Sequence, residues 1–129
     1  MINKCAGIIL DGNKILLIRR KGTSEYTSPS GQFEMGETDI DCIERELYIG
    51  LGVNTNKFEF FKTFTTDLST PNNPIAIHSW LVHISREPFP LSDIDECLWV
   101  RLSDLPYAKL TKIFQKDVIP YLSSIGIIK

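Results

Sequence analysis

Apolar and polar positions at the start of the chain follow the pattern of two short β-strands. Apolar residues dominate Cys5–Leu10, the polar segment Asp11-Gly12-Asn13 follows, and a second apolar run covers Lys14–Arg19. Asp-Gly supplies the positive φ angles that a tight hairpin turn requires. The pattern therefore predicts a β-hairpin.

From Thr38 to about Gly50 the apolar spacing becomes helical. Thr38 suits the N-cap position, and Gly50 and Gly52 mark the expected end of the helix. Residues three or four positions apart build one apolar stripe on a helix. Four residues form this stripe: Ile40, Ile43, Leu47 and Leu51.

The second half of the chain predicts strands and a closing helix. Phe58–Thr66 and Ile75–Ser85 are rich in β-branched and aromatic residues, and the breaker-rich segment 69–74 separates them. A short strand is expected at Cys97–Arg101. The apolar spacing over 110–122 predicts a helix that Pro120 kinks or splits.

Pro and Gly punctuate the segment Ser28-Pro29-Ser30-Gly31, which is therefore expected to be a turn. The order of elements is then hairpin, helix, strands and helix. Such an order builds a mixed β-sheet with helices on its faces, so the sequence predicts an α/β (α+β) fold.

Composition limits the class of protein. The 129 residues are 43% hydrophobic and 23% charged, which suits a single domain covering residues 1–129. The formal net charge of −2 gives no global field that would draw the chain to nucleic acid or to an anionic membrane. The N-terminal apolar run is too short for a signal peptide or a membrane span, so a cytoplasmic location is expected.

The three cysteines are Cys5, Cys42 and Cys97, far apart and odd in number. This arrangement matches neither a disulfide framework nor the CxxC spacing of a metal site. Free cysteine commonly packs as a small hydrophobe, so three buried thiols are expected.

The segment from Gly31 reads GQFEMGETDIDCIERELYIGLGV. It resembles the box of the Nudix hydrolase family (MutT-like), GX5EX7REUXEEXGU with U aliphatic, without a gap. Ile49 and Gly50 stand where that box has paired glutamates, so the motif is degenerate. The matching residues are Gly31, Glu37, Arg45, Glu46, Leu47, Gly52 and Val53.

The resemblance extends over nearly the whole chain. The hairpin that ends in Arg19-Arg20, the entry segment from Tyr26 and the run from Glu96 through Trp99 are typical of the family. It implies a Nudix-like α/β/α sandwich with a central mixed β-sheet. It also implies hydrolysis of a nucleoside diphosphate linked to another group, with Mg²⁺ or Mn²⁺ as cofactor.

By this resemblance Glu46 is a metal ligand or helps to activate water. Arg45 orients neighbouring carboxylates, and Glu37 supports the loop and the helix start. A structural alternative stays open for each, since adjacent charges on a helix are commonly a solvated pair. Mg²⁺ prefers octahedral oxygen coordination, so the loss of two carboxylates is expected to weaken metal binding.

Other groups could complete the site. The backbone carbonyl of Ser30 is a candidate metal ligand, and the acids Glu34, Asp95 and Glu96 are candidate replacements for the missing glutamates. For the substrate, Arg20 is a candidate phosphate ligand and Tyr26 a candidate for stacking on a base. Exposure of Arg20 and packing of Tyr26 in the core are the alternatives.

Three hypotheses follow. The first is a divergent hydrolase with weakened metal-dependent activity on a nucleoside triphosphate or a related derivative. The second is a catalytically inactive module that binds a nucleotide or a protein partner. The third is a scaffold or dimerisation unit, for which a homodimer is expected. A nucleotide-type small molecule is the expected ligand under the first two.

Overall fold

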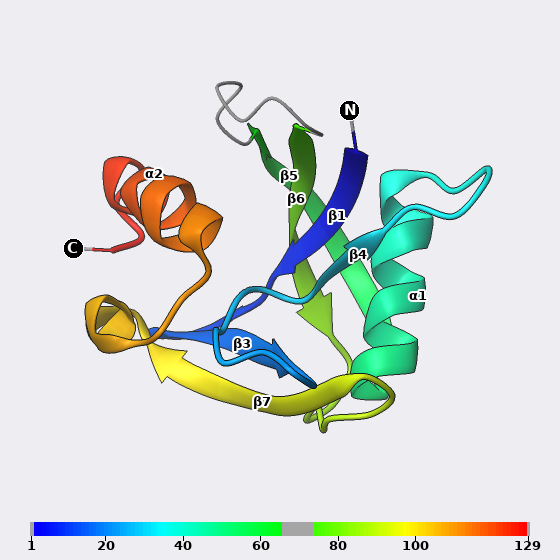
Figure 1. Cartoon of the computed structure of the whole chain (residues 1–129), viewed down its shortest axis with the longest axis horizontal. Helices are drawn as coiled ribbons and strands as arrows, with labels where there is room; N and C mark the ends of the chain where they lie inside the picture. Colours follow the sequence, from blue (N-terminus) through cyan, green and yellow to red (C-terminus); the bar gives the residue numbers. More distant parts are fainter. Residues whose placement is uncertain (1, 66–73, 129) are drawn as a thin grey trace.

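A computed structural model describes residues 2–65 and 74–128, so most of the segment 69–74 lies outside the described residues. The strands lie between helices on two opposite sides (Figure 1). In chain order the elements are β1 (Ile2–Ile8), β2 (Leu10–Asp11), β3 (Lys14–Arg20), β4 (Ser30–Gln32), α1 (Asp39–Leu51), β5 (Thr55–Thr65), β6 (Ile75–Ile84), β7 (Ile94–Arg101), η1 (Leu102–Tyr107), η2 (Phe114–Val118) and α2 (Ile119–Ser124).

The strands form two sheets. One has the order β4-β1-β6-β5, with β1 and β6 parallel and the other pairs antiparallel. The other is antiparallel with the order β2-β3-β7. The chain changes sheet at Ile9, which separates β1 from β2. The predicted α+β class with a mixed sheet is confirmed. The predicted hairpin is confirmed only next to its turn, because Leu10–Asp11 pairs with β3, whereas Cys5–Ile8 pairs with β4 and β6 in the other sheet.

Strand β3 shows how the layers are held together, because both of its faces are buried. Leu16 and Ile18 pack on the side of α1, whereas Ile15 and Leu17 pack on the side of η2 and α2. A strand covered on both faces reads as a continuous apolar run, as the segment KILLI does. Figure 1 shows α1 and α2 on opposite sides of the strands.

Helix α1 begins and ends as its sequence predicts. The side chain of Thr38 accepts a hydrogen bond from the backbone N–H of Asp41, and the Asp41 carboxylate accepts one from Thr38 N–H. This reciprocal pair is a capping box. Gly52 takes the left-handed conformation at φ 68°, which ends the helix one residue after Leu51, so Gly50 lies inside the last turn.

The expectation of a turn at Ser30 and Gly31 is wrong, because both residues belong to β4. They pair antiparallel with Ala6 and Cys5 of β1. Pro29 precedes the strand, where its missing N–H is not needed, and its carbonyl accepts from Gly7 N–H at 2.9 Å. Turn-forming residues thus introduce an edge strand that carries the start of the box segment.

The expectation of unpaired thiols is wrong for two of the three cysteines. Cys5 of β1 and Cys42 of α1 are fully buried and joined by a disulfide across 37 positions of sequence. Packing of α1 against β1 brings them together, and sequence spacing carries no sign of that contact. Cys97 is free and partly exposed, and burial raises the pKa of its thiol.

The closing helix contains the irregularity that Pro120 imposes. Residues 114–118 form a π-helical turn in which Ile119 N–H donates to the carbonyl of Phe114. Proline has no N–H, and its ring clashes with the carbonyl four residues earlier, so a wider turn before it relieves the clash. In the described part of the chain, no helix is long and apolar enough to cross a membrane.

Candidate active site

The carboxylate of Glu46 lies directly against the backbone of Gly31. A Cβ atom placed on Gly31 would be 2.1 Å from Cδ of Glu46. Separations under 3.0 Å are essentially never seen for real Cβ atoms. The glycine of β4 therefore provides the space in which the Glu46 side chain rests.

Arg45 connects the helix to the loop before it. Its Nε donates to Glu37 Oε2 at 2.7 Å, and its Nη1 donates to Glu46 Oε1 at 2.9 Å. Its Nη2 donates to the carbonyl of Gln32 at 2.8 Å and to Glu37 Oε1 at 2.9 Å. Glu37 also accepts from the backbone N–H of Glu34 at 2.7 Å. A planar guanidinium with several donors suits this bridging position.

Hydrogen bonds from Arg45, and the one from Glu34 N–H, lower the pKa of Glu37 from its ordinary value of 4.5 to about 2. A depressed carboxylate pKa contributes stability that is present above the unfolded value and is lost as pH falls through the folded value.

We therefore expect the melting temperature of the wild type to exceed that of Glu37→Gln at pH 6. The difference should narrow as pH falls from about 4.5 and be mostly lost by pH 2, as measured by thermal unfolding across this range. An equal gap at pH 6 and pH 2 would contradict this interpretation.

Arg20 reaches Glu46 from the end of β3. Its Nη2 donates to the backbone carbonyl of Ser30 and lies 3.8 Å from Glu46 Oε2. Its Nη1 donates to Asp93 Oδ2 at 2.7 Å. One guanidinium thus contacts oxygen atoms from β4, α1 and the loop before β7.

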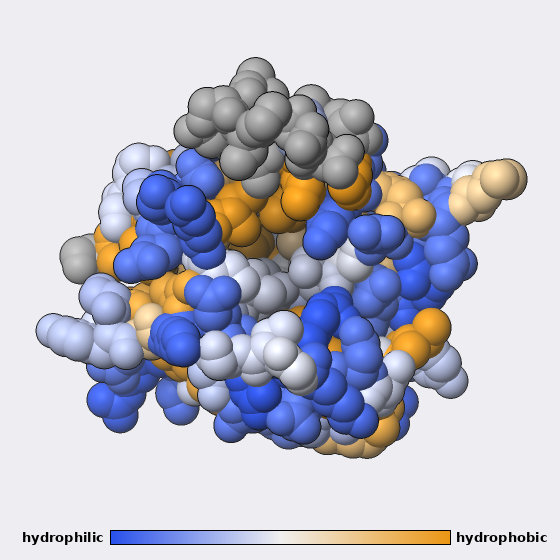
Figure 2. Space-filling model, in the orientation of Figure 1, coloured by the Kyte–Doolittle hydropathy of each residue, from blue (hydrophilic) through white to orange (hydrophobic). Residues whose placement is uncertain are grey.

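These residues line a cleft of about 200 Å³. Figure 2 shows this face of the molecule hollowed near its centre, in the region where Figure 1 places β1 and β4. Ser30 also lines a narrower pocket that holds Ser79 and the unpartnered hydroxyl of Ser28, both buried. The lining of the cleft is Lys4, Arg20, Ser30, Gly31, Gln32, Glu46 and Asp93.

Four other residues considered for the site, namely Glu34, Glu96, Tyr26 and Asp95, lie outside the lining of this cleft. The Glu34 side chain is 68% exposed, with Oε2 3.6 Å from Arg45 Nε. Glu96 accepts a hydrogen bond from the hydroxyl of Tyr26, which raises the pKa of that tyrosine, and Tyr26 packs against the core beneath η2 and α2. Asp95, the other acid considered, lies in β7 rather than in a loop and pairs with Arg19 at 2.5 Å.

The two positions at which glutamates are expected by resemblance differ in environment. Ile49 is 51% exposed. Gly50 is buried, and a Cβ atom on it would be 2.6 Å from Cδ1 of Ile94. The loop before β7 is also bonded to this end of α1, since Leu91 N–H donates to Gly50 O at 2.9 Å. Ile94 therefore fills the space beside position 50.

The residues of the cleft do not fit a resident divalent metal. Arg20 contacts the Ser30 carbonyl and one oxygen each of Asp93 and Glu46, and Arg45 contacts the second Glu46 oxygen. Within residues 2–65 and 74–128, no three side chains of His, Cys, Asp or Glu gather closely enough to hold a metal ion. A metal ion at these oxygens would lie against the positive charge of the guanidinium.

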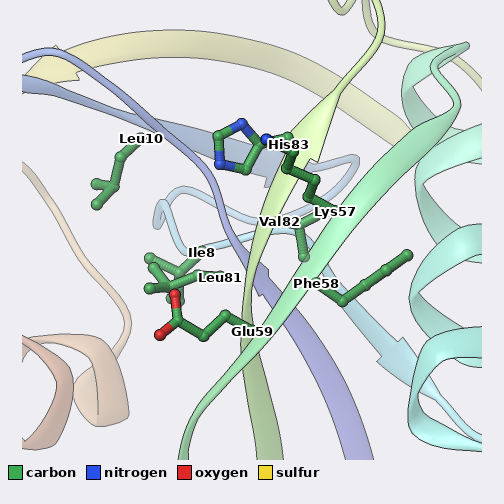
Figure 3. Close-up of a pocket in the computed structure, with 8 residues that line it drawn as sticks. All are labelled: Ile8, Leu10, Lys57, Phe58, Glu59, Leu81, Val82 and His83. Atoms are coloured by element: carbon green, nitrogen blue, oxygen red, sulfur yellow. The ribbon is translucent and has the colours of Figure 1, made fainter.

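A larger cavity of about 600 Å³ lies between β1, β2, β5 and β6 (Figure 3). It shares no lining residue with the cleft at Glu46. Its lining combines aliphatic residues with one aromatic and three ionisable residues, and comprises Ile8, Leu10, Lys57, Phe58, Glu59, Leu81, Val82 and His83. The chemical groups of the box segment are therefore concentrated at the smaller cleft.

Sequence reasoning missed Lys4 and Asp93. Lys4 lies opposite Gln32 in the pairing of β1 with β4, a strand that was expected to be a turn. Asp93 lies three residues before Glu96, and its acidic loop was the available signal. The choice among the acids of that loop depends on which one faces Arg20.

Comparison with known proteins adds three findings. The family model described as NUDIX domain matches residues 1–122. The 8-oxo-dGTP diphosphatase of Escherichia coli (strain K12) is 30% identical over 81 residues, which is 59% of this chain and 61% of that protein. The match thus spans less than two thirds of the relative's length.

Two solved structures show the same fold. A MutT NUDIX hydrolase from Burkholderia pseudomallei has a TM-score of 0.81 at 21% identity, covering 97% of this chain and 98% of that one. The NUDIX domain of Shewanella oneidensis NrtR, complexed with ADP ribose, has a TM-score of 0.78 at 13% identity, covering 97% and 88%. The predicted sandwich architecture is confirmed by these likenesses.

Proposed function

Because this chain belongs to the Nudix family, we propose that it is a divergent hydrolase of a nucleoside diphosphate linked to another group, nucleoside triphosphates included. The observation that supports this proposal is the position of the Glu46 carboxylate, which Arg45 holds at a cleft that also contains Lys4 and Arg20. A carboxylate beside two cations suits a reaction in which water attacks a phosphate.

The phosphates would bind at the cleft through Lys4 and Arg20. Guanidinium groups contact phosphate oxygens in bidentate fashion, and an ammonium group adds a compact charge. The nucleoside would extend from Ser30 toward the narrower pocket, where the hydroxyl of Ser28 and the side chain of Ser79 offer hydrogen bonds. That pocket would have to widen, since its free volume is about 20 Å³.

Glu46 would accept the proton of the attacking water. Its Oε1 is held by Arg45, so its orientation is fixed before the ligand arrives. Nudix hydrolases generally use divalent metals, and the residues at positions 49 and 50 supply no carboxylate here. The turnover proposed for this chain is therefore slow.

The test is release of phosphate or pyrophosphate from a nucleotide panel that includes 8-oxo-dGTP and ADP-ribose. The relative and the solved structure named for these compounds motivate their inclusion. Assays with Mg²⁺, with Mn²⁺ and with a chelator are expected to show slow release for at least one compound. If no compound releases phosphate or pyrophosphate under any of the three conditions, the proposal that this chain is a hydrolase is wrong.

Gly31→Ala is expected to lower kcat/KM about tenfold or more, because the new methyl group displaces the Glu46 carboxylate and misplacement of a catalytic group is costly. Stability should change little, since the added atom meets the end of a side chain. Gly7→Ala is the control, because its Cβ would lie 3.6 Å from Val82, an ordinary contact. Equal loss of activity in both variants would contradict this role of Gly31.

The burial of Gly50 by Ile94 favours a second candidate, a module that binds the nucleotide without cleaving it. A ligand that binds only the native state raises its apparent stability. The module predicts a thermal shift with a nucleotide whose concentration then stays constant over hours. A nucleotide that both stabilises the protein and disappears supports the hydrolase instead.

A further inference from the structure

We infer that the guanidinium of Arg20 occupies the place of a divalent cation in this cleft, so that the chain supplies its own positive charge to the ligand's phosphates. This inference rests on the proposed function only in taking the cleft as the ligand site. The contacts that carry it belong to the protein alone.

The oxygen atoms around Arg20 are of the kind that a hard cation would use. The Ser30 carbonyl and the carboxylates of Glu46 and Asp93 come from three separate elements and converge on one side chain. Mg²⁺ and Mn²⁺ favour carbonyl and carboxylate oxygens. The guanidinium donates to the Ser30 carbonyl and to Asp93, and its Nη2 lies 3.8 Å from Glu46 Oε2, so a metal ion bound at these oxygens would meet its positive charge.

The backbone directs Arg20 into this position. Pairing of β3 with β7 changes register between Arg19 and Arg20, so that Asp95 is the extra residue on β7. A β-bulge redirects neighbouring side chains. Lys21 N–H donates to the carbonyl of Asp93 at 2.9 Å, which holds this acid beside the end of β3.

The charges of the cleft give a divalent cation no net attraction. Lys4 and Arg20 balance Glu46 and Asp93, so the ionised lining residues sum to zero. Arg45 additionally contacts Glu46 at 2.9 Å. A divalent ion would therefore enter without a net negative charge to hold it.

Further ligands could not come from the last turn of α1. Ile49 has no coordinating atom, and Ile94 fills the space beside Gly50. The displaced Arg20 would also leave Asp93 without its 2.7 Å partner. Metal binding thus costs two ion pairs and gains a shell of at most three protein groups.

The test measures Mn²⁺ binding directly in the absence of nucleotide. Titration calorimetry and the electron paramagnetic resonance of free Mn²⁺ are the two methods. The wild type is expected to show no binding in the micromolar range. Arg20→Gln is expected to bind Mn²⁺ measurably, with an affinity at least about tenfold above the upper limit set by the wild type, because a unit positive charge leaves the vicinity of two carboxylates. Arg19→Gln, which removes the same charge from the adjacent residue paired with Asp95, should behave as the wild type.

Micromolar Mn²⁺ binding by the wild type would overturn the inference, and so would a folded Arg20→Gln protein with unchanged affinity. Adding Asp93→Asn should abolish the gain, and its persistence would place the ion elsewhere and overturn the inference too. If Arg20→Gln does not fold, Arg20→Met keeps the aliphatic stem and carries the same expectation. Because no turnover is measured, a failed hydrolase proposal leaves this result interpretable.

Discussion

Glu46→Gln is expected to lower kcat/KM by about 10²- to 10⁴-fold, the range attributed to a positioned general base. The amide keeps the length of the side chain, and its oxygen can still accept from Arg45, so the fold should persist. What the variant loses is the ability to take a proton from water. The measurement is product release from whichever nucleotide the wild type consumes fastest.

Glu44→Gln is the matched control, because it makes the same change on an exposed position of the same helix. Its turnover should equal that of the wild type. If Glu46→Gln also retains full activity, the reaction uses another base and the proposed role of Glu46 is wrong. Thermal unfolding of both variants separates loss of catalysis from loss of structure.

Reduction of the Cys5–Cys42 disulfide is expected to lower the free energy of unfolding by about 4 kcal/mol in the chain-entropy model, given the separation of 37 residues. The bond ties the helix that carries Glu46 to the central strand of the mixed sheet. Urea unfolding with and without a reductant measures the difference. Two of the three thiols should stay unreactive in the oxidised, denatured protein.

Cys97→Ser is the control, since this free cysteine should leave the effect of the reductant unchanged. Three reactive thiols in the oxidised, denatured chain would contradict the pairing. Disulfides persist in oxidising compartments and are rare in the cytosol. The disulfide favours an oxidising compartment, whereas a cytoplasmic location favours free thiols. Thiol titration in freshly lysed cells would show whether Cys5 and Cys42 are paired in the cell.

The sequence predicts most of the fold where local chemistry decides the structure. Thr38 and Gly52 mark the ends of α1 because caps act over a few residues. The strand at Ser30–Gln32 could not be predicted in the same way, because its partner β1 supplies the hydrogen bonds. Long-range pairing overrides the turn preference of Pro and Gly.

In the candidate site, too, contacts between residues close in sequence could be predicted and long-range contacts could not. Arg45 and Glu46 are adjacent on one helix, and Glu37 is close in sequence, so a motif can find them. The contact of Arg20 with Asp93 joins residues 73 positions apart and depends on a register shift between two strands. Only the folded chain shows that this arginine meets that acid.

The close approach of Gly50 and Ile94 means that a larger residue at one position requires a smaller residue at the other. A glutamate introduced at Gly50 would overlap the Ile94 side chain. Shortening Ile94 beforehand to alanine would open a cavity that costs about 2–5 kcal/mol in a buried core. Whichever substitution comes first, the intermediate protein is less stable. A glutamate at position 50 is therefore difficult to acquire by single substitutions.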